Sequence, residues 1–497
     1  MSRSPRVIVV GAGIAGITTA HVLIRRGFTD VTIVEKGDAV GGVWHWNRYP
    51  GLTCDVPSNL YQFGFAPKPD WERLFATGPQ IKQYLNDVVD SLGLRAKLLL
   101  NAEVTSAVFG DDEWTVTIAD GRTMTADFVV MATGLLHHPR VPDIRGLESF
   151  GGPVVHSARW DDDLRIRGQR IAVIGSGSTG VQLLTALNGE ASQVLHFARS
   201  PQWVMWAPME LRQPRLLTAL LTRSPAVRSW LYRALLAGSG FLADVTTVPS
   251  WRRQLLQRFA RLSLCVQVRD QALREQLTPD YEPMCKRQVL SSGYYRALQS
   301  VSAELITERI DEVTPTGIRT SDGVHHRVDM IVLATGFHSH DYMRPMQLRG
   351  RRGIRIEDVW ADGPRAYRTI AIPGLPNLFT VLGPNSPTGS ISLQYTAERT
   401  AEAIADWLDR FAVGEFGSIE VTASATDDFM KEVNDAMGST VWATGCDSWY
   451  LTPRGDVDLW PYDRATLAAM LAEHRDDHFV FTAPRQPGGS SKVGEPQ

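Results

Sequence analysis

The same glycine pattern occurs twice in this chain, and this repeat constrains the fold more than any other feature. VIVVGAGIAGITTAHVLIRRG occupies residues 7–27, and IAVIGSGSTGVQLLTALNG occupies residues 171–189. Each stretch predicts an apolar strand, a tight glycine turn and a helix with an apolar stripe. Such a unit opens a Rossmann-type domain, in which the helix N-terminus holds a pyrophosphate. A chain of 497 residues has room for about three domains, so we expect an α/β protein with two dinucleotide-binding domains.

The first glycine turn predicts a site for a dinucleotide without a 2′-phosphate. Gly11, Gly13 and Gly16 permit the tight turn, the close approach of the pyrophosphate and the close packing of the helix. The following strand ends in Glu35, 24 residues after Gly11, and Lys36 comes next. A carboxylate accepts hydrogen bonds from ribose hydroxyls and repels a 2′-phosphate. This site therefore favours the adenosine half of FAD or NAD.

The second glycine turn predicts the opposite preference. Its following strand ends in Arg199, again 24 residues after the first glycine, Gly175. A guanidinium binds a 2′-phosphate through charge-assisted hydrogen bonds, so this site favours NADPH. The residues expected to form it are Gly175, Gly177, Ser178, Thr179, Gly180, Arg199 and Ser200. A chain with an FAD site and an NADPH site is a flavin-dependent oxidoreductase.

The cysteines and the charge exclude several other functions. Cys54, Cys265, Cys285 and Cys446 form neither a C-x-x-C pair nor a zinc-binding spacing, so we expect reduced thiols and no metal site. Without a redox-active cysteine pair, electrons from the flavin must go elsewhere, and O2 is the obvious acceptor. A net charge of -3 implies no general attraction to nucleic acids or to acidic membranes. No apolar run is long enough for a transmembrane helix, so we expect a cytoplasmic protein.

Two longer motifs resemble those of the Baeyer–Villiger monooxygenases. GGVWHWNRYPGLTCD resembles one family motif at Gly41, Gly42, Trp44, Tyr49, Pro50, Gly51 and Asp55. FGGPVVHSARWD resembles another at Phe150, Gly152, His156, Trp160 and Asp161. MCKRQVLSSGYY at 284–295 looks like the family's Lys-Arg loop, and LPNLFTVLGPN at 375–385 looks like its flavin-contacting segment. The resemblance covers nearly the whole chain.

This resemblance implies a type I enzyme that carries FAD and NADPH on a single chain. In this family, reduced FAD reacts with O2 to give a flavin C4a-peroxide, which attacks a ketone carbonyl. The products are an ester or lactone, water and NADP+, and sulfide oxygenation is an expected side activity. The implied small-molecule partners are therefore a ketone and O2.

The resemblance also implies roles for particular residues. Arg287 would stabilise the peroxide and the adduct that follows, and Asp55 would hold the guanidinium in place. Lys286 would join Arg199 and Ser200 around the 2′-phosphate. Further cofactor contacts are expected at Gly42, Trp44, Tyr61, Val104 and Asn385.

The stretch FGGPVVHSARWDD at 150–162 lies between the two glycine units and joins the two halves of the chain. Its glycines and its proline suit a turn. We expect His156 and Trp160 to anchor this linker rather than to act on a substrate, so that domain rotation can move the nicotinamide.

Two other functions stay open at this point. An N- or S-hydroxylating flavin monooxygenase would have both glycine turns. Such an enzyme lacks an arginine equivalent to Arg287, and its linker motif does not end in an aspartate such as Asp161. A non-catalytic FAD-binding redox sensor would be yellow but would fail to consume NADPH.

These patterns predict a discontinuous arrangement of domains. The expected divisions are 1–146 and 340–482 for the FAD-binding domain, 147–207 and 284–339 for the NADP-binding domain, 208–283 for a helical insertion, and 483–497 for a disordered tail. Within the insertion, residues 211–276 contain many arginines and no lysine. We favour a solvated cap over the active site for this stretch, and contact with a membrane surface is the less favoured alternative. The sequence does not predict the oligomeric state.

Overall fold

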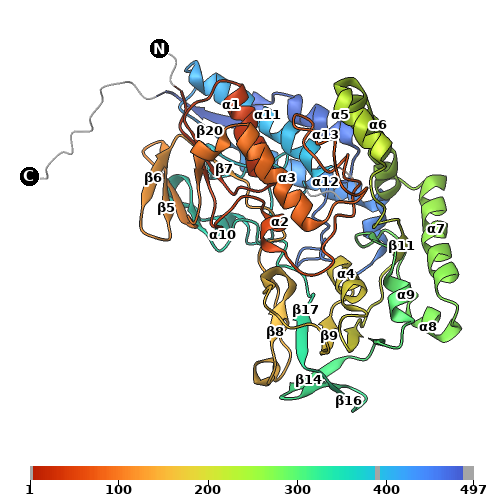
Figure 1. Ribbon diagram of the computed structural model, residues 1–497. Coiled ribbons are helices and arrows are strands. Elements are labelled where there is room, and N and C mark those ends of the chain that lie inside the picture. Colours follow the sequence, from red (N-terminus) through yellow and green to blue (C-terminus); the bar gives the residue numbers. More distant parts are fainter. Residues whose placement is uncertain (1–3, 387–391, 485–497) are drawn as a thin grey trace, which may run out of the picture.

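Two five-stranded parallel sheets organise the protein (Figure 1). The computed structural model describes residues 4–386 and 392–484. The first sheet has the strand order β19-β7-β1-β2-β3. Its strands are β1 (Val7–Val10), β2 (Val31–Val34), β3 (Leu98–Leu99), β7 (Phe128–Met131) and β19 (Leu378–Thr380). All its pairings are parallel, and helix α1 (Ile14–Arg25) makes the crossover from β1 to β2 that a parallel pair requires.

The second sheet repeats this plan with the order β13-β10-β9-β17-β8. Its strands are β8 (Val154–His156), β9 (Arg170–Ile174), β10 (Gln193–Phe197), β13 (Ala303–Ile306) and β17 (Met330–Leu333). Helix α4 (Ser178–Leu187) crosses from β9 to β10, as α1 does in the first sheet. The chain builds most of the first sheet, then the second, and returns to add β19 to the first. The predicted α/β class with two Rossmann-like sheets is confirmed.

Each glycine turn lets its helix begin directly beside the preceding strand. Gly11 has a φ of +108° and Gly175 a φ of +126°, a backbone conformation that favours glycine. A Cβ on Gly16 would lie 1.8 Å from the carbonyl oxygen of Gly11. A Cβ on Gly180 would lie 1.9 Å from that of Gly175. The third glycine of each turn therefore sets how closely the helix packs on the turn.

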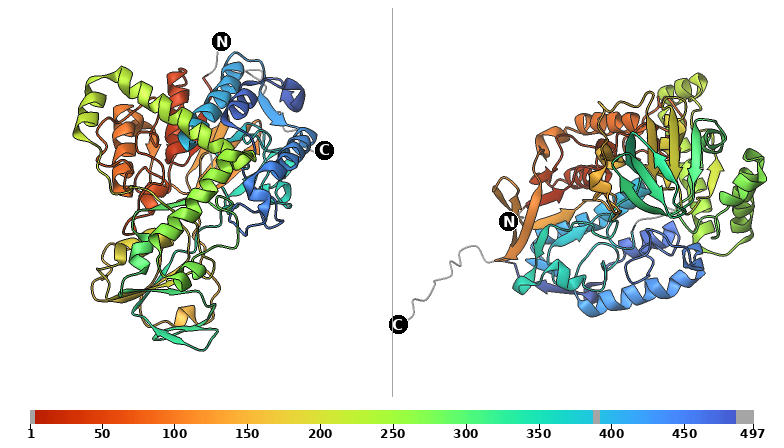
Figure 2. Two further views of the ribbon diagram at one scale, coloured as in Figure 1. Left: turned by 90° about the vertical axis from the view of Figure 1, so that its right-hand side faces the viewer. Right: turned by 90° about the horizontal axis from the view of Figure 1, so that it is seen from below.

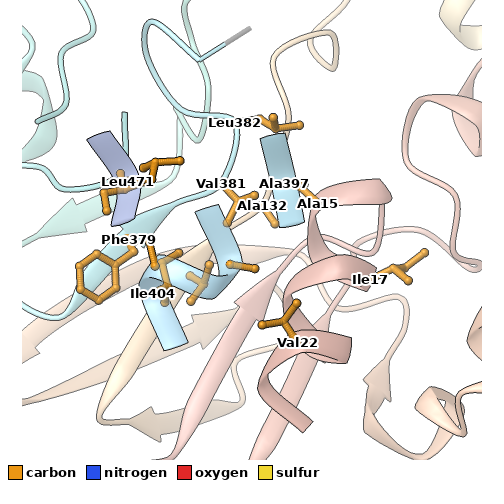
Figure 3. Packing of buried hydrophobic residues seen from close by; sticks show 14 of the residues in the cluster. Ala15, Ile17, Val22, Ala132, Phe379, Val381, Leu382, Ala397, Ile404 and Leu471 are labelled. Atoms are coloured by element: carbon orange, nitrogen blue, oxygen red, sulfur yellow. The ribbon is translucent and has the colours of Figure 1, made fainter. Parts of the chain in front are cut away.

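The first sheet is buried on both faces, which agrees with its continuous apolar strands. Every residue of β1 and β7 is buried. On one face, α1 packs against α11 (Leu393–Ala412), as Figure 3 shows. Small buried side chains such as Ala15 and Ala397 face each other there, and Ile404 extends the same core. This packing holds the first glycine turn at one end of a rigid layer.

Further strands and helices surround the two sheets. The strands are β4 (Val104–Gly110), β5 (Glu113–Ile118), β6 (Thr123–Ala126), β11 (Val204–Trp206), β12 (Val289–Ser291), β14 (Ile310–Thr314), β15 (Gly317–Thr320), β16 (His325–Arg327), β18 (Gln347–Arg349), β20 (Ser418–Val421) and β21 (Phe479–Thr482). The helices are α2 (Val43–Trp46), α3 (Gly78–Ser91), α9 (Tyr294–Leu298), α10 (Ile356–Val359), α12 (Ala423–Ala436) and α13 (Arg464–Ala472). β4, β5, β6 and β18 form one sheet, and β14, β15 and β16 form another.

The arginine-rich stretch is helical. It contains α5 (Arg215–Arg223), α6 (Pro225–Thr247), α7 (Trp251–Gln267) and α8 (Gln271–Gln276). Figure 2 (left) shows α6 and α7 crossing one side of the molecule. Within the described part of the chain, no helix is long and apolar enough to cross a membrane. Residues 485–497, which make up most of the tail predicted to be disordered, lie outside the described residues.

Candidate functional site

One cavity of about 1880 Å³ includes both glycine turns in its wall. The predicted site residues that line it are Gly11, Gly13, Glu35, Lys36, Gly42, Trp44, Asp55, Tyr61, Val104, Gly175, Gly177, Ser178, Thr179, Arg199, Ser200, Lys286 and Arg287. Gly16 and Gly180 lie beneath the turns and do not line it. Asn385 is not among the described residues that line it; it is buried, and its backbone N–H donates to Asp458 at 2.7 Å. The fold thus brings most of the predicted residues, but not Asn385, to one site.

Backbone donors hold Glu35 in the cavity wall. Glu35 is buried, and its carboxylate accepts hydrogen bonds from the N–H groups of Ala12 at 2.8 Å and Gly37 at 2.7 Å. In the described structure, α1 begins after Gly13 with no capping side chain and no acidic residue in its first turn. Its N–H groups therefore suit an anion such as a pyrophosphate. A Cβ on Gly13 would already lie 3.4 Å from the Cα of Gly42, so the two glycines keep this part of the wall open.

Two cations lie beside the second glycine turn. Here α4 begins after Gly177, which also provides no capping side chain. Neither Arg199 nor Lys286 forms an ion pair with any described residue. Burial lowers the pKa of Lys286, and the positive charge of Arg199 lowers it further. Two cations that repel each other at a cavity wall suit a bound phosphate.

Arg287 and Asp55 form a bidentate ion pair in the cavity wall. Nε of Arg287 donates to the carboxylate at 3.1 Å, and Nη2 donates to both carboxylate oxygens at 2.9 Å. The negative charge of Asp55 raises the pKa of Arg287 further above its ordinary value. The Arg287 side chain remains 40% exposed, and its Nη1 makes no hydrogen bond to a described residue. One edge of the guanidinium is therefore fixed by Asp55, and the other is available in the cavity.

Neutral side chains surround this ion pair. Burial raises the pKa of Tyr450 to about 12, although the positive charge of Arg287 opposes that rise. Burial also raises the pKa values of the Cys54 thiol and of Tyr61, whose hydroxyl accepts a hydrogen bond from Trp44 at 3.0 Å. These groups carry no charge at neutral pH, so Arg287 and its carboxylate partner dominate the local electrostatics.

The stretch 41–55 links the first glycine unit to α4. The Tyr49 hydroxyl donates to the side chain of Gln182 at 2.9 Å. Gln182 in turn donates to the carbonyl oxygen of Thr53 at 2.8 Å. Gly51 has a φ of +82°, and a Cβ there would lie 2.9 Å from the carbonyl oxygen of Gln182. The sequence did not indicate Gln182, because a lone glutamine on a helix carries no recognisable signal.

His156 and Trp160 hold the linker in place, and neither is among the described residues that line the cavity. His156 is buried, its Nε2 lies 3.1 Å from the carbonyl oxygen of Gly336, and its Nδ1 accepts the N–H of Ala158 at 3.1 Å. These contacts require a neutral ring with the proton on Nε2, and burial lowers the pKa of His156 in agreement. Trp160 is buried in the core of the second unit.

The other three motif positions of the linker differ in their surroundings. A Cβ on Gly152 would lie 2.4 Å from the carbonyl oxygen of Asp329, so only glycine fits there. Phe150 packs against the core beside the second sheet. Asp161 is exposed and accepts a local hydrogen bond from the N–H of Asp163 at 3.0 Å. None of the three lines the cavity, within the described residues.

The expectation of four reduced thiols is wrong for two of them. Cys285 and Cys446 form a disulfide across a sequence separation of 161, with their Cα atoms 6.1 Å apart. Spacing in the sequence cannot reveal such a pair, because only the tertiary fold brings the two segments together. The bond joins the loop of Arg287 to the segment that begins at Cys446. That segment lines the same cavity through residues such as Trp449.

Known proteins resemble this chain over nearly its whole length. The model of the pyridine nucleotide-disulphide oxidoreductase family matches residues 8–214. An uncharacterized monooxygenase of Mycobacterium tuberculosis is 49% identical over 477 residues, which cover 96% of each chain. A Baeyer-Villiger monooxygenase of Streptomyces coelicolor is 36% identical and is matched over 98% of this chain and 95% of its own length. The crystal structure of OTEMO in complex with FAD and NADP has a TM-score of 0.85 and 25% identity, with coverage of 97% of this chain and 100% of that chain.

Proposed function

Because this chain belongs to the type I Baeyer–Villiger monooxygenases, we propose that it inserts one oxygen atom from O2 beside the carbonyl group of a ketone. A ketone, O2, NADPH and a proton give an ester or lactone, water and NADP+. One oxygen atom enters the new C–O bond, the other leaves as water, and NADPH supplies both electrons. The observation that carries the proposal is the Arg287–Asp55 pair in one cavity with both glycine turns.

The enzyme uses FAD and NADPH, and the residues of the two turns fit these cofactors. Glu35 and the uncapped N-terminus of α1 suit the ribose and pyrophosphate of FAD. Arg199 and Lys286 suit the 2′-phosphate that distinguishes NADPH from NADH. When bound and reduced, FAD supplies the reaction with O2 that activates one oxygen atom.

The proposed role of Arg287 follows from its charge and its orientation. The guanidinium stays protonated at every working pH, and Asp55 fixes the direction in which it points. Negative charge develops on oxygen when the ketone carbonyl is attacked. A fixed cation in a site shielded from water stabilises that charge without having to reorganise. The edge of the guanidinium that Asp55 leaves free is suited to this task.

The hydrocarbon part of the ketone would contact the apolar portion of the wall. Leu382, Leu393 and Trp449 line the cavity together with Met346. Apolar walls with a few polar groups are typical of sites for small molecules, in which burial supplies affinity and polar groups supply orientation. We therefore propose a largely apolar ketone.

Isotope labelling tests the proposal. The purified protein would be incubated with NADPH, oxygen-18 gas and a panel of cyclic, aryl and steroid ketones. We expect an ester or lactone that carries one labelled oxygen atom, and the amount formed should match the amount of NADPH consumed. A redox sensor would not consume NADPH, and an N- or S-hydroxylating enzyme would label amines or sulfides but no ketone. Either result contradicts the proposal.

His156→Ala tests the proposed role of the linker between the cofactor domains. Loss of two buried hydrogen bonds costs about 1–3 kcal/mol locally, which loosens the linker where it meets Gly336. We expect NADPH consumption to continue while about half or more of the electrons appear as hydrogen peroxide, as measured by product and peroxide yields per NADPH. His325→Ala, on β16 outside the cavity, is the matched control. If His156→Ala still forms as much product per NADPH as the wild type does, the proposed role of the linker is wrong.

A further inference from the structure

Helix α7 presents an apolar stripe to the outside of the protein. The residues of the stripe and their exposed fractions are Trp251 at 70%, Leu255 at 57%, Phe259 at 44%, Leu262 at 56% and Val266 at 68%. Their spacing of three and four residues places them on one face of the helix. The opposite face supplies the buried residues Ala260, Ser263 and Leu264. A helix in a soluble domain usually turns its apolar stripe inward, so this arrangement is reversed.

The neighbouring helices continue this apolar surface. Leu216 on α5 is 83% exposed, and Trp230 on α6 is 64% exposed. α6 packs against both α5 and α7, and Figure 2 (left) shows these helices on the same side of the molecule. More than half of the exposed large hydrophobic residues of the described chain lie between residues 206 and 266. Such a concentration marks an interaction surface.

The same stretch is strongly basic. Residues 211–276 contain eleven arginines and three acidic residues, a net charge of +8, whereas the whole chain carries -3. Arg258 is exposed and borders the apolar stripe on α7, and Arg269 is exposed just beyond its end. Among the described residues, neither has a carboxylate within ion-pair distance. Basic charge is therefore concentrated around exposed apolar side chains.

The proposed monooxygenase reaction leaves this surface without a role. No described residue between 211 and 276 lines the cavity, which argues against the solvated cap favoured from the sequence. If two copies of the chain met through this surface, two stretches that each carry a net charge of +8 would face each other and would repel. A nucleic acid would use the arginines but would leave the apolar stripe exposed to water. An anionic lipid surface satisfies both features, because headgroups pair with arginine and the acyl boundary takes up apolar side chains.

We propose that α5, α6 and α7 form a docking surface for the anionic headgroup layer of a lipid bilayer. The apolar stripe of α7 enters the boundary between headgroups and acyl chains, and the flanking arginines bind the phosphates. The helices lie along the bilayer surface and do not cross it, which agrees with the lack of a spanning helix among the described residues.

Co-sedimentation with vesicles tests the proposal on the full chain. Wild-type protein is expected to bind vesicles of phosphatidylcholine mixed with phosphatidylglycerol, and to bind vesicles of phosphatidylcholine alone at least about tenfold more weakly. Leu255→Ser combined with Leu262→Ser should weaken binding at least about tenfold by removing apolar contacts. Arg258→Glu combined with Arg269→Glu should do the same and should reduce the sensitivity of binding to salt.

A matched control comes from a distant sheet of the protein. Val108 and Arg349 are exposed cross-strand partners on β4 and β18. Val108→Ser combined with Arg349→Glu makes the same kind of change there and should leave vesicle binding unchanged. Thermal unfolding of each variant checks that the fold is intact.

Three results would overturn the proposal. One is that wild-type protein does not bind anionic vesicles at low ionic strength. Another is that binding is unaffected by the α7 variants or is lost equally in the control. The third is a wild-type dimer that Leu255→Ser combined with Leu262→Ser converts to monomers, because this would identify the stripe as a contact between copies of the chain.

Discussion

Arg287→Ala is expected to lower the rate of ester formation by about a thousandfold or more, while NADPH still reduces the flavin. The variant removes the guanidinium that is held in a bidentate pair with Asp55, and with it the cation proposed to stabilise developing negative charge. Hydride transfer does not need that charge on oxygen. The two half-reactions can be measured separately, reduction by the loss of flavin absorbance without oxygen and oxygenation by the yield of ester.

Two further variants separate charge from geometry. Arg287→Lys keeps a cation but loses the planar fork that binds Asp55, so its activity should lie between those of wild type and Arg287→Ala. Arg140→Ala removes an exposed arginine that lines the same cavity, and it should leave ester formation close to wild type. Undiminished ester formation in Arg287→Ala would remove this residue from the mechanism.

The disulfide gives the loop of Arg287 a second support. Cys285 is fixed to Cys446 on one side of Lys286, and the ion pair with Asp55 fixes the loop on the other. The segment that follows Cys446 contributes Trp449 to the cavity. A single covalent bond therefore ties the proposed catalytic cation to a wall of the proposed substrate site.

The sequence predicted the parts of the fold that local patterns determine. Each glycine turn requires a backbone that other residues cannot adopt, so Gly11 and Gly175 mark the strand–turn–helix units without any tertiary information. The placement of Glu35 and Arg199 at the ends of the following strands also depends only on local geometry. Parallel strands carry these ends to the same edge of each sheet, which is why both residues reach the cavity.

Local sequence patterns could not predict the features that depend on long-range packing. The partnership of Cys285 and Cys446 exists only because the C-terminal segment folds back onto the Lys-Arg loop. The apolar residues of α7 have the same spacing as those of an ordinary buried helix face. The spacing alone therefore does not show whether this face is buried or exposed to solvent. The cofactor contact predicted for Asn385 stays a prediction, because this residue is buried beside Asp458 and is not among the described residues that line the cavity.

Arg199→Ala is expected to lower the preference for NADPH over NADH by about 10–100-fold, because the proposed charge-assisted contact with the 2′-phosphate would be lost. NADH has no such phosphate, so its KM should change little. Steady-state values of kcat/KM with both cofactors measure the effect. Glu304→Ala, on β13 of the same sheet but outside the cavity, is a control that should leave the preference unchanged. Equal losses with NADPH and NADH would refute the phosphate assignment.

The pH dependence of NADPH binding distinguishes the two cations. Burial and the charge of Arg199 lower the pKa of Lys286, so this lysine loses its proton at a lower pH than an ordinary lysine does. Because only the protonated form can make the proposed contact with the 2′-phosphate, the KM for NADPH should rise with pH as Lys286 is deprotonated, and the KM for NADH should not. Lys286→Arg keeps its charge throughout and should abolish that rise. A rise that persists in Lys286→Arg would assign the titration to a group other than Lys286 and would contradict this prediction.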